Sequence, residues 1–339
     1  MPERIVDRQV GGNTTYARAI ESGLSSRGIV VGRIPARSRP QLTMLQETLT
    51  GLQSGEVGDV LHYVADTGPL MRTRRPSVVT VHGVASRWIA TARTASQDGV
   101  WRRRVARAIA STDHVITVSH SSATDIQDVF GVAAERITTI PHGIDVDRFS
   151  QPRDFSPALR AKLPERFALY LGNVEPRKNL MPLVRAFSGD RLVAAELPLV
   201  IAGKPAWNAA ESMKLIESAR NVHYLGFVSD DDRSALMQHC AMFVFPSLYE
   251  GFGFPVLEAL AAGSVVLSSD RGSLAEVAGP SITFDDISDE GIEATVLATL
   301  SDDRAQVRCR REGRAWAERF RWSESVTSHV EIYQKLLAA

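Results

Sequence analysis

Cysteine is scarce in this sequence, and long hydrophobic runs are absent. Only two of the 339 residues are cysteines, Cys240 and Cys309, which is too few for a disulfide framework, and their spacing is not that of a metal site. No apolar stretch reaches the roughly 18 residues that cross a membrane, and the first residues contain no apolar signal core. We therefore expect a protein of a reducing compartment, the cytoplasm.

An excess of charge of either sign is also absent. Lys plus Arg number 39 and Asp plus Glu number 39, so the formal net charge is zero. A chain without a basic balance has no bulk attraction to nucleic acid, and no nucleic-acid partner is expected. Hydrophobic residues at 44% and charged residues at 23% are typical of a globular protein, and the length suffices for two domains.

Short apolar runs alternate with helical segments along the chain. This alternation predicts an α/β fold with parallel sheets, because parallel strands need helical crossovers. Expected strands are Ile5–Val10, Val60–Val64, Ser77–Val81, His114–Val118, Phe167–Leu171, Leu199–Ala202, His223–Leu225, Met242–Pro246 and Val265–Ser268. Expected helices are Tyr16–Ser25, Val100–Ala110, Ser122–Phe130, Leu180–Phe187, Asp232–His239, Asp303–Phe320 and a last one from Ser323, its N-cap, to Leu337.

A linker is expected near the middle of the chain, where Ser150-Gln-Pro-Arg-Asp-Phe-Ser-Pro157 is rich in turn residues. It predicts two Rossmann-like domains, residues 1–150 and 160–320. Their parallel sheets are expected to face each other across a cleft outside the carboxyl ends of the strands. Residues 321–339 are expected to form a C-terminal helix that packs back on the N-terminal domain.

The most informative segment is Glu250-Gly-Phe-Gly-Phe-Pro-Val-Leu-Glu258. Pro255 suits the first position of a helix, so Glu258 is expected in the first helical turn and Glu250 on the loop before it. Gly251 and Gly253 leave backbone N–H groups bare at a helix N-terminus, which favours an anion. An anion site between two carboxylates suits a sugar joined to a diphosphate. The alternative is that Glu258 only interacts with the helix dipole and Glu250 is a surface acid.

Two adjacent cations, Arg177 and Lys178, follow the expected strand Phe167–Leu171 and precede a helix. They are therefore expected at the carboxyl edge of a sheet. Fixed cations stabilise the charge that develops on the β-phosphate when a nucleoside diphosphate leaves. Arginine adds a bidentate fork to this site, and lysine adds a point charge. The alternative is an exposed basic loop.

The order of several motifs resembles that of the retaining, nucleotide-sugar-dependent glycosyltransferases of family four, which have the two-domain glycosyltransferase-B fold. The motifs are Gly11-Gly12, Val79-Thr-Val-His-Gly83, Val115-Ile-Thr-Val-Ser119, Ile140-Pro-His-Gly-Ile-Asp145, Gly172-Asn-Val-Glu-Pro-Arg-Lys-Asn179, Leu225-Gly-Phe-Val228 and Glu250 to Glu258. The resemblance covers most of the chain. One departure is Gly83, where the family often has aspartate after the histidine.

The resemblance implies a donor site in the C-terminal domain. Glu258 would bind the ribose hydroxyls, and Glu250 would hold the transferred sugar and support its positive charge in the transition state. Further donor contacts are implied for Arg177 and Lys178, for Phe227 and Val228 beside the nucleobase, and for Gly251, Phe252, Gly253 and Phe254 beside the sugar. Of these, Phe252 and Phe254 are expected as wall and core, and the backbone N–H groups of Gly253 and Phe254 as sugar contacts.

The resemblance also implies two donor contacts from the N-terminal domain. Gly11 and Gly12 would let the backbone approach the donor phosphates. His82, after the strand Ser77–Val81, would approach the donor sugar, where an imidazole accepts a hydroxyl or manages a proton. The alternatives are a plain turn at the glycines and a strand-end histidine bonded to backbone.

The acceptor side is marked by Trp101-Arg-Arg-Arg104 and Arg107, on the expected helix Val100–Ala110. The first 150 residues contain more arginines than acids and no lysine. A basic amphipathic helix binds an anionic membrane surface, so we expect peripheral contact with the inner membrane. The alternative is a solvated helix face.

No metal ion is expected. Asp145-Val-Asp147 has a metal-binding pattern, but it lies in the connector, and Arg177 with Lys178 offers the charge that a metal would supply. No cofactor is expected beyond the nucleoside-diphosphate sugar as co-substrate.

The expected function is transfer of a hexose, with mannose as a candidate, from a nucleotide sugar to a hydroxyl of a saccharide or lipid-linked acceptor, with retention of configuration. His82, Glu250, Arg177 and Lys178 are the expected catalytic residues. The alternatives are a nucleotide-sugar epimerase or a phosphorylase on the same fold, or a catalytically silent partner subunit that binds carbohydrate.

Overall fold

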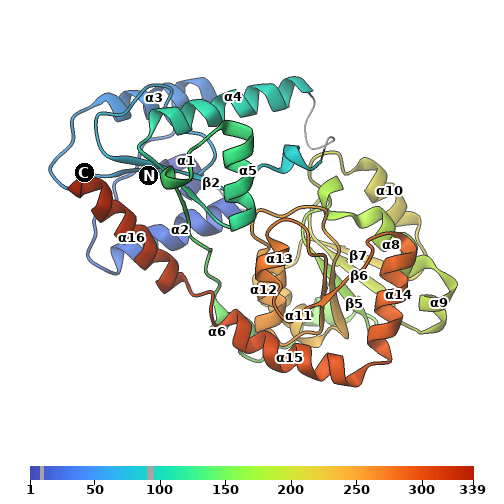
Figure 1. The fold of residues 1–339 in the computed structure, drawn as a ribbon. Helices are drawn as coiled ribbons and strands as arrows, with labels where there is room; N and C mark the ends of the chain where they lie inside the picture. The colour runs from blue at the N-terminus through green and yellow to red at the C-terminus, as the bar shows by residue number, and fades with distance from the viewer. Residues whose placement is uncertain (8–10, 90–94) are drawn as a thin grey trace. The chain divides into compact units, whose positions relative to one another are not determined.

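The computed structural model describes residues 1–7, 11–89 and 95–339 (Figure 1). Within them the chain divides into two compact units. Unit 1 comprises Met1–Gly143 and Phe320–Ala339, and unit 2 comprises Ile144–Arg319. The first division precedes residue 150, the expected domain end, because α6 (Val146–Ser150) packs on α11 (Asp230–His239) and α12 (Phe254–Ala261) of unit 2.

Unit 1 contains a four-stranded parallel sheet in the order β1-β2-β3-β4. Its described strands are β1 (Leu61–Tyr63), β2 (Ser77–Val81), β3 (His114–Thr117) and β4 (Ile137–Thr139). Its described helices are α1 (Glu3–Val6), α2 (Gly12–Ser25), α3 (Pro40–Leu52), α4 (Ala95–Ser111), α5 (His120–Phe130) and α16 (Trp322–Ala338), with 3-10 turns η1 (Ala85–Arg87) and η2 (Ala134–Arg136).

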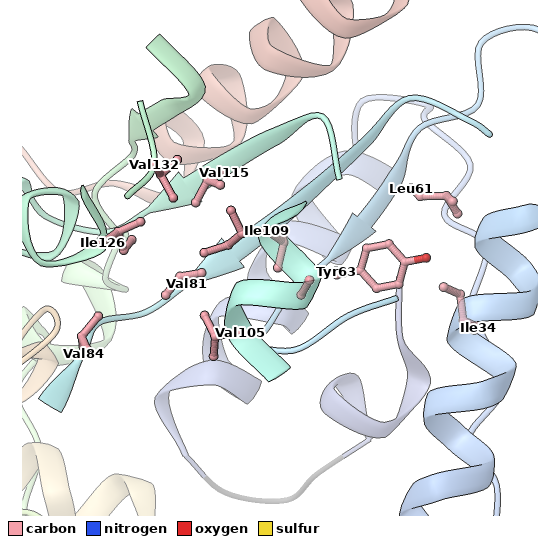
Figure 2. Packing of buried hydrophobic residues seen from close by; sticks show 12 residues of the cluster. Ile34, Leu61, Tyr63, Val81, Val84, Val105, Ile109, Val115, Ile126 and Val132 are labelled. Carbon is pink, nitrogen blue, oxygen red and sulfur yellow. The ribbon is translucent and has the colours of Figure 1, made fainter. Parts of the chain in front are cut away.

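The central strand β2 is buried along its whole length. Its sequence, Ser-Val-Val-Thr-Val, lacks strict alternation because helices cover both faces of a parallel sheet. Figure 2 shows the cluster on one side, where Val81 of β2 and Val115 of β3 pack with Val105 and Ile109 of α4. Trp101 packs against the same cluster. The apolar side of α4 is therefore used inside unit 1.

The expected strand Ile5–Val10 is wrong over its first residues. Glu3–Val6 forms the one-turn helix α1, and residues 8–10 lie outside the part of the chain that the structure describes. Ile5 and Val6 are buried in a cluster with Tyr16. A helical turn buries this apolar pair as well as a strand would. So short a run cannot distinguish the 3.6-residue period of a helix from the two-residue period of a strand.

The C-terminal helix α16 belongs to unit 1, where it packs against α2. The expected N-cap, Ser323, is wrong: the helix starts at Trp322, and Arg321 at the N-cap position makes no side-chain cap. The start of α16 lies close to Gly143, and this close approach requires glycine, because a Cβ there would lie 2.2 Å from the Trp322 backbone nitrogen. Any larger residue would push the start of α16 away.

Unit 2 contains a six-stranded parallel sheet in the order β10-β9-β8-β5-β6-β7. Its described strands are β5 (Ala168–Leu171), β6 (Leu199–Ala202), β7 (Val222–Gly226), β8 (Met242–Phe245), β9 (Val266–Ser268) and β10 (Ile282–Thr283). Besides α6, α11 and α12, its described helices are α7 (Pro157–Arg160), α8 (Leu180–Ser188), α9 (Asp190–Ala194), α10 (Ala210–Ser218), α13 (Leu274–Val277), α14 (Asp289–Leu300) and α15 (Asp303–Ala317), with the 3-10 turn η3 (Pro176–Lys178).

The expected α/β class, with a parallel sheet in each unit, is confirmed. The sequence did not predict β4 and β10, because two or three residues carry too little apolar pattern. Loops at the carboxyl ends of β5, β8 and β9 hold the residues described next.

Candidate active site

Arg177 and Lys178 lie in η3, which follows β5 at the carboxyl edge of the unit 2 sheet. Pro176 opens this turn, where its fixed backbone angle suits the first helical position. Asn179 then adopts a left-handed conformation, with φ of 57°, and α8 begins at Leu180. Lys178 is buried rather than displayed on an exposed loop, and its Nζ lies 4.7 Å from the centre of the Phe245 ring.

Glu250 joins the two cations. Its Oε1 accepts a hydrogen bond from Lys178 Nζ at 2.6 Å, and its Oε2 accepts one from Arg177 at 2.5 Å. Glu250 comes from the loop after β8, more than 70 residues further along the chain than the cations. The three side chains therefore form one buried ionic cluster, and Glu250 is not a surface acid.

The charges in this cluster set its protonation. Burial alone would raise the pKa of Glu250, but Arg177 and Lys178 hold it at about 2. Burial and the Arg177 charge lower the pKa of Lys178, which Glu250 opposes. Glu250 is therefore an ionised carboxylate at neutral pH. It accepts hydrogen bonds or stabilises a cation, and it has no proton to donate.

A second acid, Glu175, was not assigned a role from the sequence although it lies inside one of the motifs. It is 4% exposed, and its Oε1 lies 2.6 Å from Arg177 Nε. Arg177 thus bridges two carboxylates, which raise its pKa against the effect of burial. Two cations face two anions, so the cluster is neutral before any ligand arrives. The sequence signal that could have identified Glu175 is its position two residues before Arg177.

The loop that carries Glu250 is held by hydrogen bonds to its backbone. Leu248 N–H donates to the Arg177 carbonyl at 2.8 Å. Ser273 Oγ donates to the carbonyls of Glu250 and Phe252, at 3.0 and 2.7 Å. Gly253 has φ of 106° and a Cβ there would lie 2.7 Å from Leu274, so both backbone angle and space demand glycine. The carboxylate therefore sits on a rigid loop.

Glu258 forms an ion pair with a residue outside this cluster. It is in the second turn of α12, not the expected first, because the helix begins at Phe254. It is buried and forms an ion pair with Arg233 of α11. Arg233 was missed from the sequence because the residues are 25 positions apart on different helices.

The other expected donor contacts lie on the same edge of the sheet. Phe252 is buried and Phe254 is half-buried, with ring centres 5.3 Å apart. Phe227 and Val228 directly follow β7. Phe227 is 64% exposed, with Lys204 Nζ 4.3 Å from its ring centre. Gly251 is half-buried.

The remaining expected residues belong to unit 1. Gly11 has φ of 110° at the N-cap of α2, and Gly12 is the first residue of that helix. His82 follows β2 directly; its Nε2 donates to the Val64 carbonyl at 3.1 Å, and its backbone N–H donates to Asp66 at 2.9 Å. The backbone-bonded alternative thus describes one contact of His82. Its ring packs among other aromatic side chains.

The fold defines a class of protein, the glycosyltransferase-B fold with two parallel α/β units, and this chain has a cluster of cations and acids at the carboxyl edge of its second sheet. Residues 59–148 match the family model described as Glycosyltransferase Family 4, and residues 153–316 match the one described as Glycosyl transferases group 1. The chain carries both domains of this glycosyltransferase family, and the resemblance seen in its motifs is confirmed.

Two curated relatives are mannosyltransferases. The chain is 34% identical over 233 residues to the O-antigen chain mannosyltransferase B of Escherichia coli, a match that covers 66% of this chain and 60% of the relative. It is 30% identical over 245 residues to the MMP alpha-(1->4)-mannosyltransferase of Mycolicibacterium hassiacum, covering 70% of this chain and 57% of the relative. The match therefore spans less than two thirds of either relative.

Among solved structures, the chain resembles Anabaena Alr3699/HepE in complex with UDP and glucose. The TM-score is 0.72 at 17% identity, over 97% of this chain and 96% of that one. At this identity the likeness establishes the fold. No helix in the described ranges is both long and apolar enough to cross a membrane.

Proposed function

We propose that this protein is a retaining glycosyltransferase that moves a hexose from a nucleoside-diphosphate sugar to an acceptor hydroxyl. One observation carries the proposal: Glu250 gathers Arg177 and Lys178 into a buried cluster at the carboxyl edge of the group 1 domain. Cations held in place before the reaction stabilise the leaving diphosphate at no cost of reorganisation. Both cations belong to the chain itself, so we propose a metal-independent reaction with no cofactor.

In this mechanism Arg177 and Lys178 bind the β-phosphate oxygens. Glu250 orients both cations, and a carboxylate retains further lone pairs for the hydroxyls of the transferred sugar. Its negative charge also favours the oxocarbenium-like transition state. We propose front-face attack, in which the leaving phosphate takes the proton of the acceptor hydroxyl, so configuration is retained without a covalent nucleophile.

The donor and acceptor classes are supported by the relatives. Two of them are mannosyltransferases, which favours mannose as the sugar. We propose that Glu258 binds the ribose, with Arg233 holding its carboxylate in place, and that Phe227 and Val228 contact the base. His82, Gly11 and Gly12 would reach the donor from unit 1. The acceptor would be a saccharide or a lipid-linked saccharide.

A thermal-shift screen against nucleoside diphosphates tests donor binding, because a ligand at 100 times its Kd stabilises the native state by about 2.7 kcal/mol. Turnover with the sugar of the preferred base then tests the chemistry. We expect Arg177→Gln to lower kcat by about 10²–10³-fold, the usual effect of losing one donor to a developing anion. The exposed lysine Lys214 is the matched control, and Lys214→Gln should leave kcat unchanged.

The rival functions give different products. An epimerase would convert the donor sugar without consuming an acceptor, and a phosphorylase would require inorganic phosphate. A silent partner subunit would bind the diphosphate and turn over no donor. Any of these results would overturn the transferase assignment, whereas full activity in Arg177→Gln would overturn the role of the cation pair alone.

We also propose that the protein works in the cytoplasm, at the inner surface of an anionic membrane. Cys240 and Cys309 are both free and buried, which is compatible with a reducing compartment. The membrane-facing element is better sought in α3 than in α4, whose apolar side packs in the core. Leu42, Leu45 and Leu49 of α3 are 46, 52 and 47% exposed.

The inward side of α3 is polar, which explains why its leucines point outward. Thr43 and Glu47 are buried, and Glu47 accepts a hydrogen bond from Arg4 Nε at 2.6 Å. The exposed arginines Arg37 and Arg39 precede the helix. An apolar stripe beside cations matches the interface of an anionic bilayer.

A further inference from the structure

Unit 1 encloses a group of aromatic and imidazole rings that the proposed reaction does not use. Tyr16 of α2, His62 of β1 and His329 of α16 are all buried. Thr80 of β2 lies among them, and Tyr333 of α16 bonds His62. These side chains come from four elements, two of them at opposite ends of the sequence.

The hydrogen bonds among them run in one direction. His329 Nδ1 lies 2.7 Å from the Ser325 carbonyl, so this nitrogen must carry the proton and Nε2 must accept. Tyr16 OH therefore donates to His329 Nε2, at 2.7 Å. Thr80 Oγ1 lies 2.9 Å from the Tyr16 oxygen and must donate to it.

The same logic fixes the remaining members. His62 Nε2 then donates to Thr80 Oγ1, at 2.7 Å, and His62 Nδ1 accepts from Tyr333 OH, also at 2.7 Å. Both histidines are satisfied as neutral rings. The chain of donors begins at Tyr333 and ends at Ser325, so it starts and finishes on α16 after passing through the sheet and α2.

Tyr16 also forms one wall around His82. The two rings meet edge to face, with centres 5.0 Å apart and planes at 81°. A second wall is the His142 ring, 5.4 Å from His82. His142 lies in turn 5.8 Å from Trp322, the first residue of α16. Both rings that flank His82 thus contact the C-terminal helix: Tyr16 contacts His329, and His142 contacts Trp322.

We propose that α16 is a positioning element for the reaction: through Tyr16–His329 and His142–Trp322 it holds the His82 ring in the one orientation that presents Nδ1 as an acceptor. The third constraint is the Val64 carbonyl, which accepts a hydrogen bond from His82 Nε2–H. A neutral imidazole bonded in this way keeps its lone pair on Nδ1. Tyr16 and His329 are positioning residues, because neither needs to touch the donor. The proposal rests on the role of His82 in the proposed function.

The test compares substitutions at two places in this chain of hydrogen bonds. Tyr16→Phe and His329→Leu free the wall of His82, whereas Tyr333→Phe removes a buried hydroxyl from the same network at its far end. We expect the first two to lower kcat roughly ten- to a hundredfold with the donor KM unchanged, as for a misplaced group. Tyr333→Phe should lower the melting temperature without lowering kcat.

An NMR titration of the histidine ring protons gives a second readout that needs no turnover, with His82→Gln to assign the signal. Burial lowers the pKa of His82, while Asp66 and the Val64 hydrogen bond oppose that shift, and Tyr16, His142 and His329 face it from the other elements. In Tyr16→Phe a loosened, wetter ring should titrate at higher pH, closer to its ordinary value, and the acid limb of the kcat profile should move with it.

Unchanged titration and unchanged kcat in both wall variants would overturn the proposal, as would equal effects in Tyr333→Phe. The proposed function fails separately. If no nucleotide sugar is turned over, the titration still reports whether α16 orients the ring. If His82→Gln retains full transfer, the role of His82 is lost, and the positioning proposal falls with it.

Discussion

At the scale of single residues, the central feature is that Glu250 binds both cations at once. Each oxygen serves a different partner, Lys178 or Arg177, and Glu175 holds the opposite side of the arginine. An arginine and a lysine of like charge would otherwise repel each other in a buried site. The acid therefore makes the close approach of the two cations stable in a buried site.

Removing the charge of Glu250 should destabilise unit 2. We expect Glu250→Gln to lower the free energy of unfolding by about 3–5 kcal/mol at pH 7, the usual cost of deleting one partner of a buried ion pair. Urea denaturation measures this. The matched control is Glu211→Gln on the exposed side of α10, which should change it by less than about 0.5 kcal/mol.

The same variant has a defined pH dependence. The folded pKa of Glu250, about 2, lies below its ordinary value of 4.5, so its contribution is complete above pH 4.5 and is lost as the pH falls toward 2. The difference between wild type and Glu250→Gln should shrink over this window. A difference that stays constant down to pH 3 would contradict the ion-pair account.

At the scale of elements, α3 rather than α4 exposes an apolar stripe, although the sequence pointed to the α4 segment as the membrane-facing helix. The arginine-rich α4 uses Trp101, Val105 and Ile109 in the core, whereas α3 exposes its leucines. A helix orients its faces by what the neighbouring elements require, and here the polar face of α3 meets Arg4 and Tyr63. The surface available to a membrane is therefore set by packing rather than by composition.

Replacing Leu42, Leu45 and Leu49 by glutamine tests this surface, since glutamine keeps helix propensity while removing apolar area. We expect the triple variant to lose cosedimentation with vesicles of anionic phospholipid and to keep its melting temperature. Val307→Gln on α15, where the side chain is 63% exposed, is the control and should bind as wild type. Undiminished vesicle binding would exclude α3 as the membrane-binding surface. If size exclusion shows a dimer for wild type that the triple variant loses, the leucine stripe serves self-association instead.

At the scale of the whole molecule, the two units differ in their buried histidines. His62, His142 and His329 of unit 1 are buried, and burial lowers the pKa of each, that of His329 to about 4. Unfolded histidine takes up its proton near pH 6.5. The contribution of these buried histidines to the stability of unit 1 is therefore complete above that pH and is lost as the pH drops toward 4. In unit 2, the contribution of Glu250 is lost only below pH 4.5.

Hydrogen exchange should therefore distinguish the units at pH 5. His329 alone accounts for about 2 kcal/mol of lost stability there. We expect peptides from β1, β2, α2 and α16 to lose protection between pH 7.5 and pH 5, after correction for the intrinsic rate, while those of the unit 2 sheet keep theirs. His223→Gln, at an exposed histidine of unit 2, should leave the protection of peptides from both units unchanged. Equal loss in both units would contradict the assignment to the buried histidines.

Much of the architecture could be predicted because its signals are local. Ser77–Val81 and Leu199–Ala202 are strands with the expected bounds, since short runs rich in β-branched and other apolar residues have few other outcomes. Glu250, Arg177 and Lys178 were found as candidates because their types and spacing are visible in the chain. The strand expected over Ile5–Val10 is wrong over its first residues, because the four-residue run Glu3–Val6 fits a helical turn equally well.

The sequence by itself determined the α/β class, the longer strands and helices, and which residues carry charge near strand ends, because these depend on neighbours within a few positions. Only the tertiary structure decided that Glu250 binds both cations, that Arg233 holds Glu258 and that α16 supports the walls of His82. The physical reason is that ion pairs and ring contacts depend on distance in space, and parallel strands with helical crossovers bring together residues that lie tens to hundreds of positions apart.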